Sequence, residues 1–125
     1  MISIEFENRS GRSVDCCALV SACREVLHRE GVVAGELGLH VVDSEEMRLL
    51  KHEHLGVDDV GDVLSFPLDG RAELPAGEPR ALGDLVLCPL AVDDDWRAAL
   101  VHGLLHLLGY EHGAAMERRE AELVP

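Results

Sequence analysis

Three histidines near the end of the sequence have the residue type and the spacing of metal ligands. His102 and His106 are four residues apart, so on a helix they lie one turn above each other, with about 6 Å of rise between them. Gly109 allows the backbone to leave the helix and to turn His112 back toward the same point. Three imidazoles on one ion leave a coordination position open, as in catalytic zinc sites. We therefore expect a catalytic metal site at a helix end.

This spacing matches the metalloprotease pattern H-E-x-x-H-x-x-G-x-x-H at every position except one. Gly103 stands where the protease has its glutamate, so a metal ion here could still acidify a bound water, but the proton acceptor must come from elsewhere. Only 13 residues follow His112, which leaves little room for a methionine turn beneath the metal. The pattern therefore favours a metal site but disfavours a protease. Three-histidine sites accept zinc, nickel and cobalt, so the metal stays open at this point.

The elements that must position these histidines are short and alternate in type. Apolar residues at every second position predict strands, and apolar residues at helical spacing predict helices. Ser13 is a candidate cap for the first helix and Gly31 its stop, while Ser44 begins the second helix. In chain order we expect a strand at 2–7, a helix at 14–29, a strand at 37–41, a helix at 44–55, strands at 62–67 and 83–89 joined by a long loop at 68–82, and helices from Asp93 to Gly109 and at about 114–123.

This order of elements predicts an α+β fold. We expect a small mixed four-stranded sheet packed with about four helices, with the metal site at a helix end. The chain has 125 residues and no repeat or linker, so residues 1–125 are predicted to form a single domain. The other histidines lack ligand spacing and are interpreted as surface or packing residues; they are His28, His40, His52 and His54.

Composition limits the class of protein. With 47% hydrophobic residues the chain is expected to fold around a core. The formal charge of −13 argues against a broad electrostatic grip on nucleic acid, which depends on Lys and Arg. The acidic N-terminus and the short apolar runs predict neither a signal peptide nor a membrane span. Four cysteines without a C-x-x-C pair indicate reduced, mostly buried thiols in a cytoplasmic protein.

Two motifs of the sequence resemble a known family. Residues 102–112 match the signature H-G-x-L-H-L-x-G-Y-D-H of the YbeY family of bacterial rRNA-maturation endoribonucleases, with Glu111 in place of the aspartate. Residues 62–67 match the D-V-L-S-F-P strand of that family, and Gly83 and Asp84 match its G-D strand start. The resemblance extends from about Leu37 to Leu123.

The resemblance implies a zinc-dependent, single-strand-specific endoribonuclease that acts in 16S rRNA 3′-end maturation and ribosome quality control in the bacterial cytoplasm. His102, His106 and His112 would bind one Zn²⁺ per chain, with nickel or cobalt as possible substitutes. Asp62 and Ser65 would lie near the cleft. Proton transfer would use Glu111, Asp62 or water. The implied partners are single-stranded RNA, rRNA or a ribosomal particle, and a ribosomal or assembly-factor protein, with no membrane.

The sequence departs from the family pattern at positions that bear on catalysis. Leu55 stands where the family usually has an arginine, Gly61 replaces a threonine, and the segment between Cys88 and His102 is shortened. Arginine hydrogen bonds to phosphate are strong, so the loss weakens the case for catalysis. Arg97 is a candidate replacement. The run Asp93 to Asp95 is interpreted as a solvated helix start.

Two alternatives to the nuclease therefore stay open. One is a catalytically weakened ribosome-assembly or binding module that retains the metal site. The other is a metal-dependent hydrolase of another small substrate. Under the nuclease hypothesis, the acidic chain needs RNA delivered by a partner or a set of arginines gathered on one face. The candidates for that set are Arg9, Arg12, Arg24, Arg29, Arg71 and Arg80.

Overall fold

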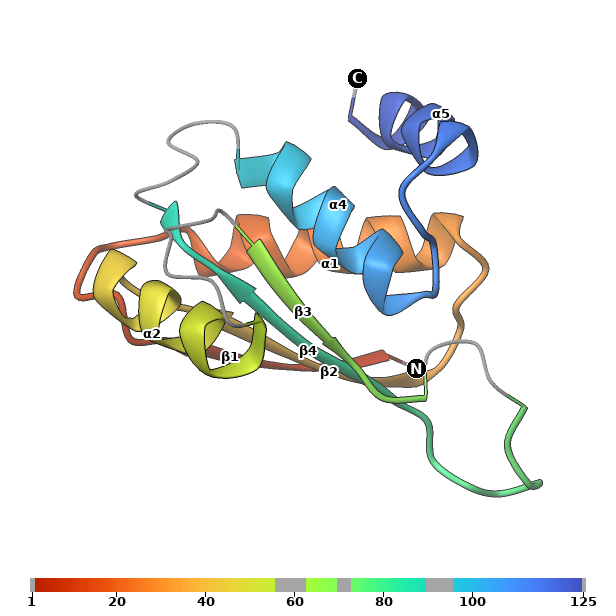
Figure 1. Cartoon of the computed structure of the whole chain (residues 1–125). Helices are drawn as coiled ribbons and strands as arrows, with labels where there is room; N and C mark the ends of the chain where they lie inside the picture. Colours follow the sequence, from red (N-terminus) through yellow and green to blue (C-terminus); the bar gives the residue numbers. More distant parts are fainter. Residues whose placement is uncertain (1, 56–62, 70–72, 90–95, 125) are drawn as a thin grey trace.

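The computed structural model describes residues 2–55, 63–69, 73–89 and 96–124 (Figure 1). Its centre is a four-stranded mixed sheet with the strand order β1-β2-β4-β3. Strands β1, β2 and β4 run parallel, and β3 pairs antiparallel with β4. The strands are β1 (Ile2–Asn8), β2 (Gly35–Val41), β3 (Val63–Pro67) and β4 (Ala81–Leu87).

Four helices surround the sheet in the described part of the chain. They are α1 (Cys16–Arg29), α2 (Ser44–Leu55), α4 (Trp96–Leu107) and α5 (Ala114–Leu123). Helices α1 and α4 cover one face of the sheet, α2 lies against the other, and α5 packs near α4 (Figure 1). The α+β class, the order of the elements and the mixed four-stranded sheet are thereby confirmed. None of the described helices has the length and apolar character needed to cross a membrane.

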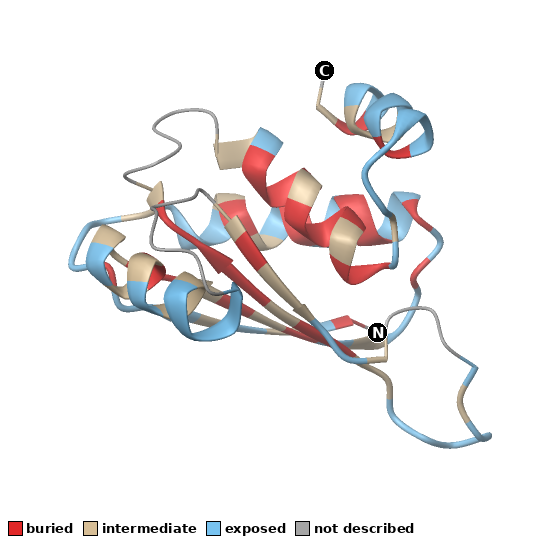
Figure 2. Ribbon diagram, in the orientation of Figure 1, coloured by how far each residue is buried: buried red, intermediate tan, exposed pale blue. Residues whose placement is uncertain are grey.

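The main core lies between the sheet and helices α1 and α4 (Figure 2). Strand β2 shows why the two-residue repeat predicts this arrangement, because Leu37, Leu39 and Val41 are buried while Glu36 is exposed and His40 is half-buried. Alternate side chains of a strand point to opposite faces, so the apolar set meets the helices. Helix α4 is almost wholly buried along its middle, and this fixes it firmly on the sheet.

A second, smaller core lies under α2. Met47 of α2 packs there against Leu64 and Val86 of the sheet, together with Val42 and Cys88. Helix α2 covers only part of this face, and the remainder carries polar side chains such as Glu5 and His40. The face of the sheet toward α1 and α4 is therefore buried, and the opposite face is partly exposed to solvent.

Several of the predicted boundaries are wrong by one or two residues. Helix α1 begins at Cys16, because Asp15 rather than Ser13 caps it, its Oδ1 accepting a hydrogen bond of 3.0 Å from the Ala18 amide. Asp43 holds the first turn of α2 in the same way, accepting from the Glu46 amide at 2.8 Å. Strand β4 begins at Ala81 rather than at residue 83. The predicted helix start at residues 93–95 lies outside the described residues.

The cysteines differ from the prediction of mostly buried thiols. Cys23 and Cys88 are buried, but Cys16 and Cys17 are exposed in the first turn of α1. All four are free thiols. Burial raises the pKa of Cys23 to about 12, partly offset by the charge of Arg24, so this thiol stays protonated and unreactive at neutral pH.

Candidate metal centre

Gly103 brings α4 close to the sheet beneath the two histidines of the helix. A Cβ atom at this position would lie 2.3 Å from Leu85 Cδ1 and 2.7 Å from Val63 Cγ2, which is far inside van der Waals contact. The Ser65 hydroxyl of β3 donates a hydrogen bond of 2.8 Å to the Gly103 carbonyl. The position where the protease pattern has glutamate therefore faces packed sheet, which gives the physical reason for the missing carboxylate.

The end of α4 is closed by a Schellman motif centred on Gly109. The Tyr110 amide donates to the Leu105 carbonyl, and the Gly109 amide donates to the His106 carbonyl, both at 3.0 Å. Gly109 has φ +96°, and a Cβ there would meet no atom within 4 Å. The glycine is thus required for its left-handed backbone, not for space. The chain turns here and returns toward the helix, as the sequence predicts.

The three predicted histidines come together at this turn. One nitrogen each of His102, His106 and His112 lies within 4.8 Å of the other two, and within the described residues these three histidines form the group that could hold a metal ion. The His102 and His106 Nε2 atoms are 3.2 Å apart. Two nitrogens bound at about 2.0–2.1 Å to a tetrahedral ion are separated by about 3.3–3.4 Å. The distance between the Nε2 atoms of His102 and His106 in the structure is therefore close to the distance that such an ion requires.

Two of the histidines are held through their other ring nitrogen. His106 Nδ1 donates a hydrogen bond of 3.0 Å to the main-chain carbonyl of Tyr110. His102 Nδ1 lies 3.0 Å from Glu120 Oε1 of α5 and donates to it. Such partners fix the tautomer and orientation of a metal ligand. Both Nε2 atoms are therefore left to face the centre of the cluster.

The pKa of His106 lies below its usual value. Burial is the largest cause, and the positive charges of His102 and His112 act in the same direction. The hydrogen bond to the Tyr110 carbonyl and the charge of Glu120 oppose this change but do not cancel it. A neutral imidazole is the form that binds metal, so the site favours the ligand form of His106.

The other predicted site residues have different positions. Glu111 is exposed beside His112, and its carboxylate does not belong to the histidine group. Ser65 contacts the backbone of α4 as described, and Asp62 lies outside the described residues. Leu55, at the C-terminal end of α2, is 57% exposed.

The arginines that the sequence offered as phosphate-binding candidates interact with other parts of the protein. The Arg97 guanidinium pairs with Glu25 of α1 and donates to the Leu123 carbonyl. Arg9 pairs with Glu46 at 2.6 Å. Of the other arginines, Arg24 donates to the Ile2 carbonyl, Arg29 lies 3.9 Å from Glu25, and Arg71 is outside the described residues. The described members of the six arginines proposed to gather are thus spread over α1 and the loops.

Sequence reasoning missed three groups that support the cluster. They are the Tyr110 carbonyl, the Glu120 carboxylate and, behind them, Glu30. Tyr110 lies within the histidine motif, but its main-chain contact has no signal in the sequence. Glu120 is 18 residues from His102, so only the packing of α5 on α4 brings the two together.

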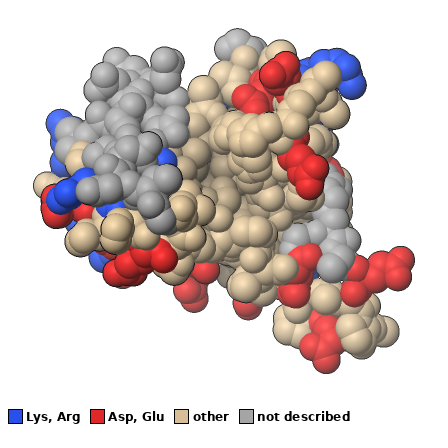
Figure 3. All heavy atoms as spheres, viewed as in Figure 1, with Lys and Arg blue, Asp and Glu red and all other residues tan. Residues whose placement is uncertain are grey.

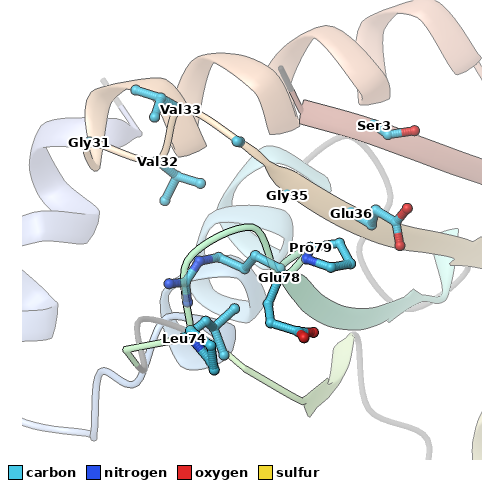
Figure 4. Close-up of a pocket in the computed structure, with 12 residues that line it drawn as sticks. Ser3, Gly31, Val32, Val33, Gly35, Glu36, Leu74, Glu78 and Pro79 are labelled. Atoms are coloured by element: carbon cyan, nitrogen blue, oxygen red, sulfur yellow. The ribbon is translucent and has the colours of Figure 1, made fainter.

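A separate cavity of about 660 Å³ opens between the α1–β2 connection and the loop before β4 (Figure 4). Glu36 and Glu78 stand on its walls together with Val33, Leu74 and Pro79. None of the three histidines is among its described lining residues. We therefore place the candidate chemistry at the histidine cluster and not in this cavity.

The surface carries charges of both signs with acidic groups in excess. On the face shown in Figure 3, acidic side chains appear over α5 and over the loop at 73–80, and basic side chains appear mainly on the α2 side and at the tip of α5. This agrees with the formal charge of −13. Among the described residues visible in this view, the basic side chains form no continuous track for a nucleic-acid backbone.

Comparisons with known proteins agree with this fold. The solution structure of a protein from Thermotoga maritima superposes with a TM-score of 0.58 and 23% identity, covering 99% of this chain and 87% of that chain. This likeness concerns the fold alone. The superposition extends over almost the whole of the present chain.

Comparisons of sequence are more specific. Proteins named Endoribonuclease YbeY from Salinispora tropica and Halorhodospira halophila are each 37% identical to the chain. The matches cover 95% and 97% of the chain and 88% and 87% of the relatives. The family model described as Endoribonuclease YbeY matches residues 5–123. The chain therefore belongs to the endoribonuclease YbeY family.

Proposed function

We propose that this chain is a metal-dependent endoribonuclease that cuts single-stranded RNA. The relatives named Endoribonuclease YbeY support the reaction class. The observation that carries the proposal is the convergence of His102, His106 and His112, whose ligand nitrogens lie within 4.8 Å of one another. Three nitrogen donors leave a position for water or for a phosphate oxygen, which is the arrangement of a catalytic rather than a structural zinc site.

The ion that we assign to the site is one Zn²⁺ per chain, for which nickel or cobalt can substitute. When bound, it would supply a Lewis acid for the phosphate and a water of lowered pKa. His102 and His106 present their Nε2 atoms to this position because Glu120 and the Tyr110 carbonyl accept from their Nδ1 atoms. His112, on the returning chain, completes the set.

The remaining candidate residues receive different roles. We assign Ser65 a positioning role, because its hydroxyl donates to the Gly103 carbonyl and ties β3 to α4 beneath the ligands. Glu111, Asp62 or solvent water accepts the proton from the nucleophile. The nucleophile itself is water or the 2′-hydroxyl of the RNA. Of these groups, Glu111 is solvent-exposed next to His112, where substrate can reach it.

The proposed setting is 16S rRNA 3′-end maturation and ribosome quality control in the bacterial cytoplasm, carried out by a single domain of residues 1–125. The acidic surface and the formal charge of −13 weaken a direct electrostatic grip on RNA. We therefore propose that a partner presents the RNA. That partner is the ribosomal particle, through a ribosomal or assembly-factor protein.

A second candidate function is an assembly or binding module that keeps the metal but cleaves weakly. The specific observation in its favour is the lack of the family's arginine, because Leu55 occupies its place and Arg97 is bound to Glu25. A charge-assisted contact to phosphate supplies on the order of 10³-fold in related phosphoryl-transfer reactions. A chain without it would bind RNA or its partner and turn over slowly.

The deciding experiment measures cleavage of a single-stranded rRNA fragment by zinc-loaded protein, with His106→Ala prepared in parallel. Cleavage by the parent and none by the variant supports the nuclease and excludes a contaminating enzyme. No cleavage by protein that holds one zinc per chain favours the binding module. Leu55→Arg adds a second comparison, because it raises cleavage only if the missing arginine limits catalysis.

A further inference from the structure

We propose that Glu30 is a positioning residue for the metal centre, acting through the two segments that orient the ligand histidines. The inference rests on the metal site of the proposed function. Glu30 follows directly after α1, far from His102 in the sequence, and only 2% of its side chain is exposed. A carboxylate buried to this extent is stable only where its oxygens are paired.

The two oxygens of Glu30 accept from two different parts of the site. Tyr110 Oη donates to Oε1 at 2.7 Å, and Arg119 Nε donates to Oε2. Arg119 is also held from a second side, because its Nη2 donates to the Arg29 carbonyl at 3.0 Å. One buried group thus joins the turn after α4 to helix α5 and to the end of α1.

The two residues that donate to Glu30 are the two arms of this arrangement. Each arm either contains, or lies next to, the group that accepts a hydrogen bond from a ligand histidine. Tyr110 is itself the residue whose carbonyl accepts from His106 Nδ1. Arg119 directly precedes Glu120, whose carboxylate accepts from His102 Nδ1. The distance between the two acceptors is therefore set by Glu30, which grips both segments at once. Moving either arm would rotate an imidazole out of the cluster.

Helix α5 is held by a small number of described contacts, among them the hydrogen bond from Arg97 to the Leu123 carbonyl. It has ten residues, no side-chain cap at its N-terminus, and only Met116 and Leu123 buried within it. Isolated helices of this length are marginal in water. The Glu30–Arg119 pair is therefore one of the contacts that keep Glu120 against His102.

The test measures affinity for Co²⁺ alone, titrated into metal-free protein and followed by its visible absorption. Tyr110→Phe removes only the hydroxyl that reaches Glu30, and Glu30→Gln keeps the size but removes the charge. The matched control is Glu122→Gln, which removes the exposed partner of Arg119 on the other side. Circular dichroism and thermal melting of the metal-free proteins report folding separately from metal binding.

We expect Co²⁺ to bind about five- to tenfold more weakly to Tyr110→Phe, and more weakly still to Glu30→Gln, since changes in outer-shell partners cost about 10- to 100-fold. The absorption bands of the saturated variants should also shift, which a merely structural role would not cause. Glu122→Gln should stay within about twofold of the parent. If Glu30→Gln fails to fold, Tyr110→Phe alone decides.

Two results would overturn the inference in distinguishable ways. Folded variants with parental affinity and parental bands would remove Glu30 from the site and leave the proposed metal centre intact. A parent protein that binds no Co²⁺ would refute the metal centre itself, and the role of Glu30 with it.

Discussion

Two clusters that contain histidine lie on opposite faces of the sheet, and within the described residues only the one at the end of α4 brings its ligand atoms close enough together to hold a metal ion. On the partly covered face, His40 of β2 lies between Glu7 of β1 and Asp84 of β4, with its Nδ1 3.2 Å from Glu7 Oε1 and its Nε2 3.0 Å from Asp84 Oδ1. Strands β1 and β4 flank β2, so the two carboxylates approach opposite edges of one ring. The two carboxylates thus lie on opposite sides of the His40 ring. At the end of α4, in contrast, the ligand nitrogens of three histidines face one common position.

Exposure does not distinguish the two clusters. The His40 side chain is 26% exposed and the His102 side chain 32%. Both histidines also have a carboxylate at hydrogen-bond distance. The difference lies in the backbone, because a helix followed by a left-handed turn aims three rings at one point, while neighbouring strands place groups in a row. The residue types alone would therefore not have shown which of the two clusters could bind a metal ion.

The largest expected effect separates the clusters by metal content. His106→Ala should lower bound zinc from one ion per chain to none after dialysis, because two ligands rarely retain the ion. His40→Ala is the matched control and should keep the full metal content. Elemental analysis of both purified proteins gives the answer. Zinc retained by His106→Ala, or lost from His40→Ala, would contradict the assignment of the site.

A second contrast uses one glycine from each face. Gly103→Ala places a methyl group against buried Leu85 and Val63, and we expect the free energy of unfolding to fall by about 1–3 kcal/mol through overpacking. Gly38→Ala meets the flexible end of Asp84 instead, which can move into solvent, so the loss should stay below about 1 kcal/mol. Urea denaturation measures both. Equal losses would mean that α4 is free to shift away from the sheet.

The third test concerns pH and the metal-free protein. Because burial lowers the pKa of His106 in the folded state, the unfolded chain binds more protons between the lowered value and about 6.5. The stability that neutral His106 contributes to the folded state is therefore present above about pH 6.5, and it is lost as the pH falls through the lowered pKa. Stability in the presence of a chelator should decline on acidification, more steeply than in His106→Gln. Zinc affinity should decline over the same range, since protons compete for the ligands.

The smallest expected effect is on the partly covered face. Asp84→Asn keeps the shape of the side chain but removes its charge next to His40, and Asp84 is half exposed. We expect a loss of about 0.5 kcal/mol or less in the free energy of unfolding, reduced further by high salt. Urea denaturation at low and high salt measures it. A loss of several kcal/mol would mean that the row Glu7–His40–Asp84 stabilises the sheet more than an exposed pair can.

The elements of the fold follow from local patterns and were predictable for that reason. The alternation at Ile2, Ile4 and Phe6 reports one buried strand face, and Ala114–Leu123 has the composition of a short helix. The three histidines belong to one helix and its turn, so their spacing carried enough information. Errors occurred where neighbouring residues compete for one role, as when Asp15 and not Ser13 caps α1.

The support of the site could not be read from the sequence because it is built from distant residues. Glu30 and Arg119 are separated by 89 positions, and neither belongs to a motif. Only the packing of α5 near the end of α1 brings them together. The requirement for glycine at position 103 also comes from tertiary packing. The sequence shows that the glutamate is missing, but it does not show the two side chains of the sheet that leave no space for a glutamate.

The Schellman turn at Gly109 has a consequence for anyone who transplants this site into a designed helix. Copying the three histidines would not be sufficient, because the acceptor of the His106 ring is a peptide oxygen whose direction the turn determines. A scaffold that continues as regular helix past this point would lack both that oxygen and the reversal that returns His112. A transplanted site therefore needs the stretch from His102 to His112 with its glycine and also an acceptor in the place of Glu120, and its geometry is encoded in a backbone dihedral as much as in side chains.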